Sequence, residues 1–236
     1  MCGRYTLAPT SLSLFTERFG LAPPPASAAS YNVTPGRAIA TITQRQGEAP
    51  SCDLLHWGLI PSWAASSERA YKMINARAET VTEKRAYSPL LERNRCLIPA
   101  DGFFEWQSRA GKPKQPWWFH LADANLFSFA GLWTTWKPEP DVEPVNSCTI
   151  LTVAANAVVS PVHGRMPLIL RRADEAPWID PAVNAERALA VIAANANDGL
   201  LRQPVSRSVN SPGNQGPECI AAVDDDAAEN GSSTLF

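Results

Sequence analysis

The start of the chain contains a potential nucleophile with two reactive groups. Met1-Cys2-Gly3-Arg4 makes Cys2 the N-terminal residue once the initiator methionine is removed, and small second residues permit that removal. A terminal cysteine has an α-amine with a pKa of about 8 and a thiol with a pKa of about 8.5, so both are partly available near neutral pH. This pair can capture an aldehyde as a Schiff base that closes to a thiazolidine, or the thiol can transfer acyl groups with the amine as its base. Taken alone, Cys2 is equally compatible with a chance residue in a frayed terminus.

Five other segments combine polar groups with aromatic or turn residues. Taken singly, Asn32 and Asn75 have an ordinary explanation as turn caps, and His163 as a core histidine. Glu105 stands among aromatic residues, either on the solvent face of a strand or in an apolar pocket that raises its pKa, as in a general acid. The segments are Tyr31–Gly36, Trp57–Trp63, Asn75–Thr80, Asp101–Trp106 and His163–Pro167.

Length and composition indicate one soluble globular domain, expected over residues 1–221. The chain has 236 residues, 45% of them hydrophobic, which is enough for a sizeable core. The sequence shows no signal-peptide h-region and no window that approaches the ~20 apolar residues of a membrane span, so the expected location is cytoplasmic. The five cysteines are scattered without a C-x-x-C pair, which predicts neither a disulfide framework nor a zinc site.

Charge is unevenly distributed along the chain. The formal net charge is −2, and without the four acidic residues of the segment 222–236 it would be +2, so this segment is predicted to be a disordered acidic tail. Basic residues outnumber acidic ones between positions 69 and 95, which favours a local positive patch. The basic residues there are Arg69, Lys72, Arg77, Lys84, Arg85, Arg93 and Arg95.

Strands must position most of these groups, because apolar or alternating runs separated by turn residues dominate the chain. Helical periodicity is confined to four shorter stretches. The predicted fold is α+β, with a mainly antiparallel curled sheet or barrel and peripheral helices. Strands are expected at 38–43, 54–59, 95–99, 103–106, 117–121, 126–133 and 148–154, and helices at 11–19, 85–92, 172–179 and 182–195.

In their order along the chain, these motifs resemble the SOS response-associated peptidase (SRAP) family of abasic site processing proteins. The resemblance covers roughly residues 2–220 and includes motifs at almost regular intervals. They are MCGRY at 1–5, the segments 31–36 and 57–63, NARAET at 75–80, PADGFFEW at 99–106, FAGLW at 129–133, HGRMP at 163–167 and PVSR at 204–207.

The resemblance implies covalent capture of abasic sites in single-stranded DNA by a thiazolidine at Cys2, which shields the lesion during the DNA damage response. The residues suit that chemistry. Glu105 and His163 can move protons at the sugar oxygens, and Asn75 can hydrogen-bond the sugar hydroxyl. The family name also implies a peptidase activity, for which autocatalytic removal of Met1 is the expected extent.

The implied partner is single-stranded DNA containing abasic sites, bound by a monomer without cofactor or metal and associated with the nucleoid when on DNA. Arginines suit phosphate contacts, and Trp63 could stack on a base. For Arg85 an ordinary position on a helix surface explains the residue equally well. The expected DNA-binding residues are Arg4, Asn32, Pro35, Gly36, Trp63, Arg77, Arg85 and Arg165.

Three alternatives remain open at the level of the sequence. Glutamine amidotransferase domains also begin Met-Cys-Gly, which allows an N-terminal-nucleophile amidohydrolase, although their other glutaminase motifs are missing here. A general peptidase lacks support from a Ser/His/Asp order or a metal site. A noncatalytic single-stranded DNA binder would make Cys2 incidental and would bind without regard to the lesion.

Overall fold

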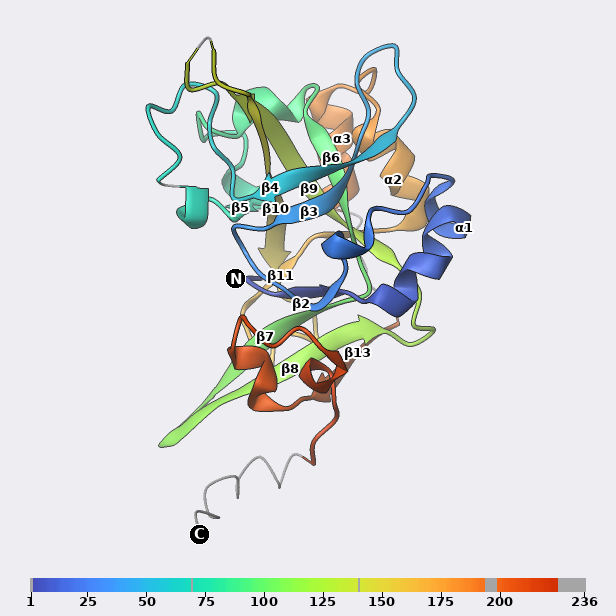
Figure 1. Ribbon diagram of the computed structural model, residues 1–236, viewed down its shortest axis with the longest axis vertical. Coiled ribbons are helices and arrows are strands. Elements are labelled where there is room, and N and C mark those ends of the chain that lie inside the picture. Colours follow the sequence, from blue (N-terminus) through green and yellow to red (C-terminus); the bar gives the residue numbers. More distant parts are fainter. Residues whose placement is uncertain (1, 69, 140, 194–198, 225–236) are drawn as a thin grey trace.

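Five strands form a closed barrel at the centre of this computed structural model, which describes residues 2–68, 70–139, 141–193 and 199–224. Neighbouring strands pair in the order β10–β4–β3–β6–β9, and β9 pairs again with β10 to close the ring (Figure 1). Only the pairing of β10 with β4 is parallel within this ring. The barrel strands are β3 (Ala38–Thr43), β4 (Ser51–Trp57), β6 (Arg95–Ala100), β9 (Phe127–Trp136) and β10 (Val145–Ala154).

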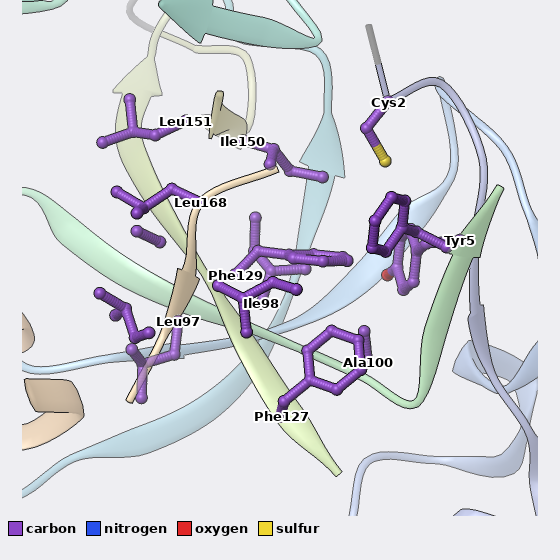
Figure 2. Packing of buried hydrophobic residues seen from close by; sticks show 14 of the residues in the cluster. Cys2, Tyr5, Leu97, Ile98, Ala100, Phe127, Phe129, Ile150, Leu151 and Leu168 are labelled. Carbon is purple, nitrogen blue, oxygen red and sulfur yellow. The ribbon is translucent and has the colours of Figure 1, made fainter. Parts of the chain in front are cut away.

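Apolar side chains from the barrel strands fill the main core. Ile98, Phe129 and Ile150 come from three different strands and gather in one buried cluster (Figure 2). Gly131 on β9 has no room for a side chain, because a Cβ there would lie 2.8 Å from Cys96 Sγ. The missing side chain therefore lets β9 pack tightly between its two neighbours, β6 and β10.

A second sheet lies against one end of the barrel and contains five strands in the order β13–β8–β7–β1–β2. Its β7–β8 hairpin projects from the body of the molecule (Figure 1). The N-terminal strand β1 is internal to this sheet, because it pairs with β2 on one side and β7 on the other. The strands are β1 (Tyr5–Leu7), β2 (Ser30–Val33), β7 (Gly102–Arg109), β8 (Lys112–Leu121) and β13 (Leu200–Pro204).

Three short strands pair with the barrel strands β9 and β10 outside the closed ring. Both β5 and β11 pair with β10, in parallel and antiparallel orientation respectively, whereas β12 pairs with β9. The strand β10 therefore brings together two segments that are far apart in the sequence. The short strands are β5 (Asn75–Arg77), β11 (Arg165–Pro167) and β12 (Ile169–Leu170).

The helices are short and peripheral. Among the described residues, no helix is long and apolar enough to cross a membrane. The α-helices are α1 (Phe15–Phe19), α2 (Arg172–Ile179) and α3 (Ala185–Ala193), and the 3-10 segments are Pro9–Leu14, Ala26–Ala28, Ala70–Lys72, Ala78–Thr80, Ser88–Leu91, Arg207–Asn210 and Pro217–Cys219.

The predicted α+β class with a barrel-like, mainly antiparallel core is confirmed. The helix expected over 85–92 is wrong in extent, because only the 3-10 turn Ser88–Leu91 forms there. Pro89 explains this, since it lacks the N–H that an α-helix interior requires and is tolerated only in a first turn. Residues 194 and 195 of the last predicted helix lie outside the described residues.

The described C-terminal part of the chain returns to the second sheet, where Ala222 forms a bridge with Val205. Most of the predicted acidic tail, residues 225–236, lies outside the described residues. The boundary between residues 221 and 222 stays a prediction.

One residue of the predicted positive patch belongs to the interior. Arg95 is 1% exposed, and its guanidinium donates hydrogen bonds to carbonyl oxygens that include those of Glu92 and Val183. It joins β6 to the segments beside it, so Arg95 is removed from the expected patch. Arg69 lies outside the described residues.

Candidate active site

The Cys2 side chain lies in the core, not in solvent. It is 0% exposed, and its sulfur points toward the rings around Tyr5 (Figure 2). Its Sγ donates a hydrogen bond to the carbonyl oxygen of Arg4 at 3.5 Å. Burial raises the pKa of this thiol far above its ordinary value, and the negative charge of Glu105 nearby adds to the effect. The thiol is therefore protonated at neutral pH, in contrast to the partly ionised thiol expected for an exposed terminus.

Asn75 connects the N-terminal segment to the barrel. It is the first residue of β5, and the parallel pairing of β5 with β10 places it opposite Ile150. Its Nδ2 donates a hydrogen bond of 2.8 Å to the carbonyl oxygen of Cys2. Its Oδ1 is buried without a hydrogen-bond partner among the described residues. Asn75 therefore fixes the backbone of Cys2 and retains one acceptor for a ligand.

Glu105 and His163 form the titratable pair of this site. Glu105 lies on β7, opposite Trp117 of β8, whereas His163 lies in the segment before β11. Oε1 of Glu105 is 3.7 Å from Nδ1 of His163, and the side chain of Glu105 is only 5% exposed against 31% for His163. Nδ1 of His163 also lies between the carbonyl oxygen of Arg165, at 2.9 Å, and the backbone N–H of the same residue, with its nitrogen at 3.1 Å.

The environment of Glu105 favours its neutral form. Burial raises the pKa of this carboxyl above its ordinary value, and the charge of a protonated His163 acts in the opposite direction. A carboxyl group with a raised pKa can act as a proton donor, and its carboxylate can act as a proton acceptor. The sequence left two environments open for Glu105, the solvent face of a strand or a pocket that raises its pKa, and in the fold its side chain is buried.

The side chains of Arg4 and Asn32 are joined to each other. Arg4 donates a hydrogen bond from NH1 to Oδ1 of Asn32 at 3.0 Å. Asn32 is 0% exposed, and its Nδ2 donates to the carbonyl oxygens of Val209, Ser211 and Asn214. In this structure, Asn32 therefore holds Arg4 and the C-terminal loop in place and presents no free surface.

Pro35 and Gly36 form the turn between β2 and β3. Gly36 is exposed and has a φ of +84°, a conformation that favours glycine. Its N–H donates to the carbonyl oxygen of Trp57 at 2.9 Å, which ties the turn to the end of β4. This turn offers backbone, rather than side chains, at the surface.

Arg77 and Arg165 lie on opposite sides of β10. Arg77 of β5 pairs with Thr152, and Arg165 of β11 pairs with Ala154. Arg77 is exposed, whereas the guanidinium of Arg165 is bound bidentately by the carboxylate of Glu79 and also bonds Thr152 O at 2.6 Å. The two strands thus place a cation on each side of the strand that also positions Asn75.

Trp63 and Arg85 form a cationic and aromatic surface beside Asn75. Trp63 is 57% exposed, and the guanidinium carbon of Arg85 lies 5.0 Å from the centroid of its ring. An open groove of about 450 Å³ joins these residues to the start of β5. Its lining consists of Trp63, Asn75, Ala76, Arg77, Thr80, Lys84, Arg85, Ala86 and Tyr87.

A second groove, of about 510 Å³, starts at the N-terminal segment and was not expected from single residues. Trp106 is central to it: its ring centroid is 5.9 Å from the guanidinium carbon of Arg4, and its Nε1 donates to Asn210 Oδ1 at 2.7 Å. The sequence does contain a sign of this groove: side chains alternate along β7, so Trp106 lies on the face of the strand opposite to Glu105. The lining residues are Gly3, Arg4, Trp106, Pro113, Lys114 and Asn210.

The candidate groups of the site are the thiol of Cys2, the amide of Asn75, the carboxyl group of Glu105 and the imidazole of His163. Within the part of the chain that the structure describes, no three His, Cys, Asp or Glu side chains are grouped as metal ligands. The five cysteines are all free.

The chain is similar along most of its length to curated proteins from bacteria and animals. It is 39% identical over 224 residues to abasic site processing protein YoqW of Bacillus subtilis, covering 93% of this chain and 99% of that protein. It is 31% identical to abasic site processing protein YedK of Escherichia coli, with 94% and 100% covered. With abasic site processing protein HMCES of Gallus gallus it shares 35% identity, over 83% of this chain and 66% of that protein.

Solved structures share the fold. A Bacteroides thetaiotaomicron protein superposes with a TM-score of 0.82 at 22% identity, covering 94% of this chain and all of the other. A phage-related protein of Bordetella bronchiseptica gives a TM-score of 0.70 at 28% identity, with 91% and 99% covered. The profile of the family described as SOS response associated peptidase (SRAP) matches residues 1–212. The chain therefore belongs to the SOS response associated peptidase (SRAP) family.

Proposed function

We propose that this protein senses abasic sites in single-stranded DNA and crosslinks to them through Cys2 once Met1 has been removed. The observation that supports this most strongly is the convergence of Cys2, Asn75, Glu105 and His163 from four separate segments of the chain. Several curated relatives are named abasic site processing proteins, and the proposal extends that activity to this chain.

The chemistry balances without a cofactor. The α-amine of Cys2 adds to the aldehyde carbon of the ring-opened sugar, and the resulting carbinolamine loses its hydroxyl as water to leave an iminium ion. The sulfur then bonds to the same carbon while its proton leaves, and the iminium nitrogen receives the electron pair. The product is a thiazolidine, and one water molecule is released for each aldehyde captured.

The structure supports an order in which the amine reacts first. The buried thiol of Cys2 is protonated, because burial and Glu105 raise its pKa. A neutral Glu105 can give its proton to the departing oxygen, and its carboxylate can then accept a proton from the thiol. His163, 3.7 Å away, can exchange protons with Glu105 between these steps. Ring closure thus takes place after Glu105 has lost its proton to the departing oxygen.

Asn75 has two functions in this proposal. Its Nδ2 holds the carbonyl oxygen of Cys2, which directs the N-terminus into the site. Its buried Oδ1, without a partner among the described residues, can accept a hydrogen bond from a sugar hydroxyl. A buried acceptor left without a partner is costly, so the substrate would satisfy it.

DNA binding relies on the two grooves that begin at this site. Trp63 is exposed enough to stack on a base, and exposed arginines beside it can pair with phosphates. Gly36 and Pro35 offer backbone at the surface, and Asn32 acts by holding Arg4. The arginines proposed to contact phosphates are Arg4, Arg77, Arg85 and Arg165.

The direct test is to mix the full-length protein with single-stranded DNA that contains one abasic site. Mass spectrometry first establishes that Met1 is absent. We expect a heat-resistant adduct whose mass equals protein plus DNA minus one water, and no adduct for Cys2→Ala or for undamaged DNA. The proposal is wrong if the wild type without Met1 forms no adduct. Ammonia release from glutamine by the same preparation would instead favour the amidohydrolase alternative.

A further inference from the structure

The guanidinium of Arg165 is already paired with an anion in the DNA-free protein. Its NH1 lies 2.5 Å from Oε1 of Glu79, and its NH2 lies 2.8 Å from Oε2, so both carboxylate oxygens are used. This pairing is the one that a guanidinium forms with two oxygens of a phosphate. Glu79 therefore has the geometry of a phosphate substitute at Arg165.

The fold brings the two residues together across β10. Glu79 follows β5 on one side of that strand, and Arg165 begins β11 on the other. On its inner side, Arg165 is held independently by Thr152, whose carbonyl oxygen is 2.6 Å from NH2. The side chain of Arg165 is thus fixed from within even without Glu79.

Glu79 is the replaceable partner of the two. Its side chain is 51% exposed, whereas that of Arg165 is 19% exposed. The hydrogen bond from Arg165 lowers the pKa of Glu79, so the carboxylate of Glu79 is ionised at neutral pH. A phosphate that approaches Arg165 therefore meets a fully charged competitor. Exposed ion pairs are weak, and an incoming phosphate can displace the carboxylate into solvent.

We propose that Glu79 determines specificity by competing with DNA phosphates for Arg165. This inference rests on the proposed function, because it takes Arg165 as a phosphate contact. Every DNA strand that binds must displace Glu79 from Arg165, and this displacement lowers the affinity of the protein for undamaged and damaged DNA alike. Only a DNA strand with an aldehyde then stays bound, because its covalent bond to Cys2 does not depend on that affinity. Discrimination between damaged and undamaged DNA increases as a result.

The test compares Glu79→Gln with Glu83→Gln, which removes the same charge from an exposed residue of the same segment. Binding is measured with a single-stranded oligonucleotide that carries a tetrahydrofuran in place of the abasic sugar and so cannot form a Schiff base. We expect Glu79→Gln to bind about fivefold more tightly than Glu83→Gln at low salt. Because the same phosphate contacts Arg165 in both variants, their slopes of log K against log salt should differ by less than about 0.7, the value for one phosphate on a single strand.

A second pair of variants tests whether Glu79 acts through Arg165. In an Arg165→Ala background, the extra gain from Glu79→Gln over Glu83→Gln should disappear, as expected for two coupled residues in a double-mutant cycle. The inference is overturned if Glu79→Gln binds no more tightly than Glu83→Gln, if it binds more weakly than wild type, or if no variant binds the oligonucleotide.

The outcome can be separated from that of the proposed function. An absent adduct with abasic DNA, together with a gain for Glu79→Gln on the tetrahydrofuran oligonucleotide, would contradict only the covalent chemistry. A normal adduct without that gain would contradict only the competition by Glu79.

Discussion

Oε1 of Glu105 lies 3.7 Å from Nδ1 of His163, and this contact joins the two sheets of the protein. Glu105 belongs to β7 of the five-stranded sheet, whereas His163 directly precedes β11 of the barrel sheet. Neither sheet contains both residues by itself. The candidate site therefore exists only where the second sheet meets the barrel.

Replacing Glu105 by Gln should slow crosslinking by about 10²-fold or more, the range for removal of a general acid or base. The amide has nearly the same shape but cannot release or accept the proton. The measurement is the rate of adduct formation at saturating abasic DNA, followed by denaturing electrophoresis. Affinity for the tetrahydrofuran oligonucleotide serves as the control and should stay within about twofold of wild type. A loss confined to affinity would contradict the acid/base role.

The same substitution should change how stability depends on pH. Burial raises the pKa of Glu105, so the folded protein keeps this proton at pH values where the unfolded chain, with a carboxyl pKa of about 4.3, has released it. The contribution of Glu105 to the free energy of unfolding therefore falls as pH rises from about 4 toward the raised pKa. Glu105→Gln should lose less stability than wild type over this range in thermal unfolding. Parallel curves for the two proteins would show that Glu105 titrates normally.

Asn75→Ala should slow adduct formation by about 10- to 100-fold, because hydrogen bonds to the Cys2 carbonyl and to the sugar are both lost, each worth about 1 kcal/mol. Asn75→Asp is the matched variant: it keeps an acceptor but directs a carboxylate oxygen at the Cys2 carbonyl, and should be slower still. Rates at saturating DNA separate this from weaker binding. A wild-type rate for Asn75→Ala would exclude the positioning of Cys2 by this amide.

Asn32→Ala should lower the free energy of unfolding by about 1–3 kcal/mol, because the carbonyls of Val209, Ser211 and Asn214 lose a shared donor. Asn125→Ala, in an exposed turn, is the control and should stay within about 0.5 kcal/mol. Chemical denaturation provides the measurement. If Asn32→Ala weakened DNA binding while leaving the unfolding curve unchanged, a direct contact with DNA would replace the structural role.

Trp63→Ala should weaken binding of single-stranded DNA by the equivalent of about 1–3 kcal/mol, the range for one stacked base. Because Trp63 is 57% exposed, its replacement should barely change the melting temperature. Leu201→Ala removes another exposed apolar side chain, 47% accessible and located on β13, and should leave binding unaffected. Equal binding by both variants would place the DNA path away from Trp63.

The long elements of the fold could be predicted from the sequence because their patterns extend over enough residues. The strand expected at 38–43 and the helix expected at 172–179 have the observed bounds. The strands β1, β5 and β11 were not predicted, since three residues are too few to establish an alternation. They form through pairing with β7 and β10, which are remote in sequence.

The residues of the site could be selected by type, but their environments could not. The burial of Cys2 depends on packing of β1 between two strands, and the bond between Glu79 and Arg165 depends on β5 and β11 sharing β10. Such relations are tertiary and leave no local pattern. The roles expected for the candidate residues stay predictions until the variants are measured.

The internal position of β1 has a practical consequence for experiments. Strand β1 is hydrogen-bonded on both edges, and only two residues separate it from Cys2. Because Asn75 also holds the carbonyl oxygen of Cys2, the start of the chain is fixed in the fold. In the proposed chemistry, an affinity tag fused ahead of Met1 leaves Cys2 without a free α-amine and needs space inside the site. Purification handles belong at the C-terminus, and N-terminally tagged protein should serve as an inactive reference preparation.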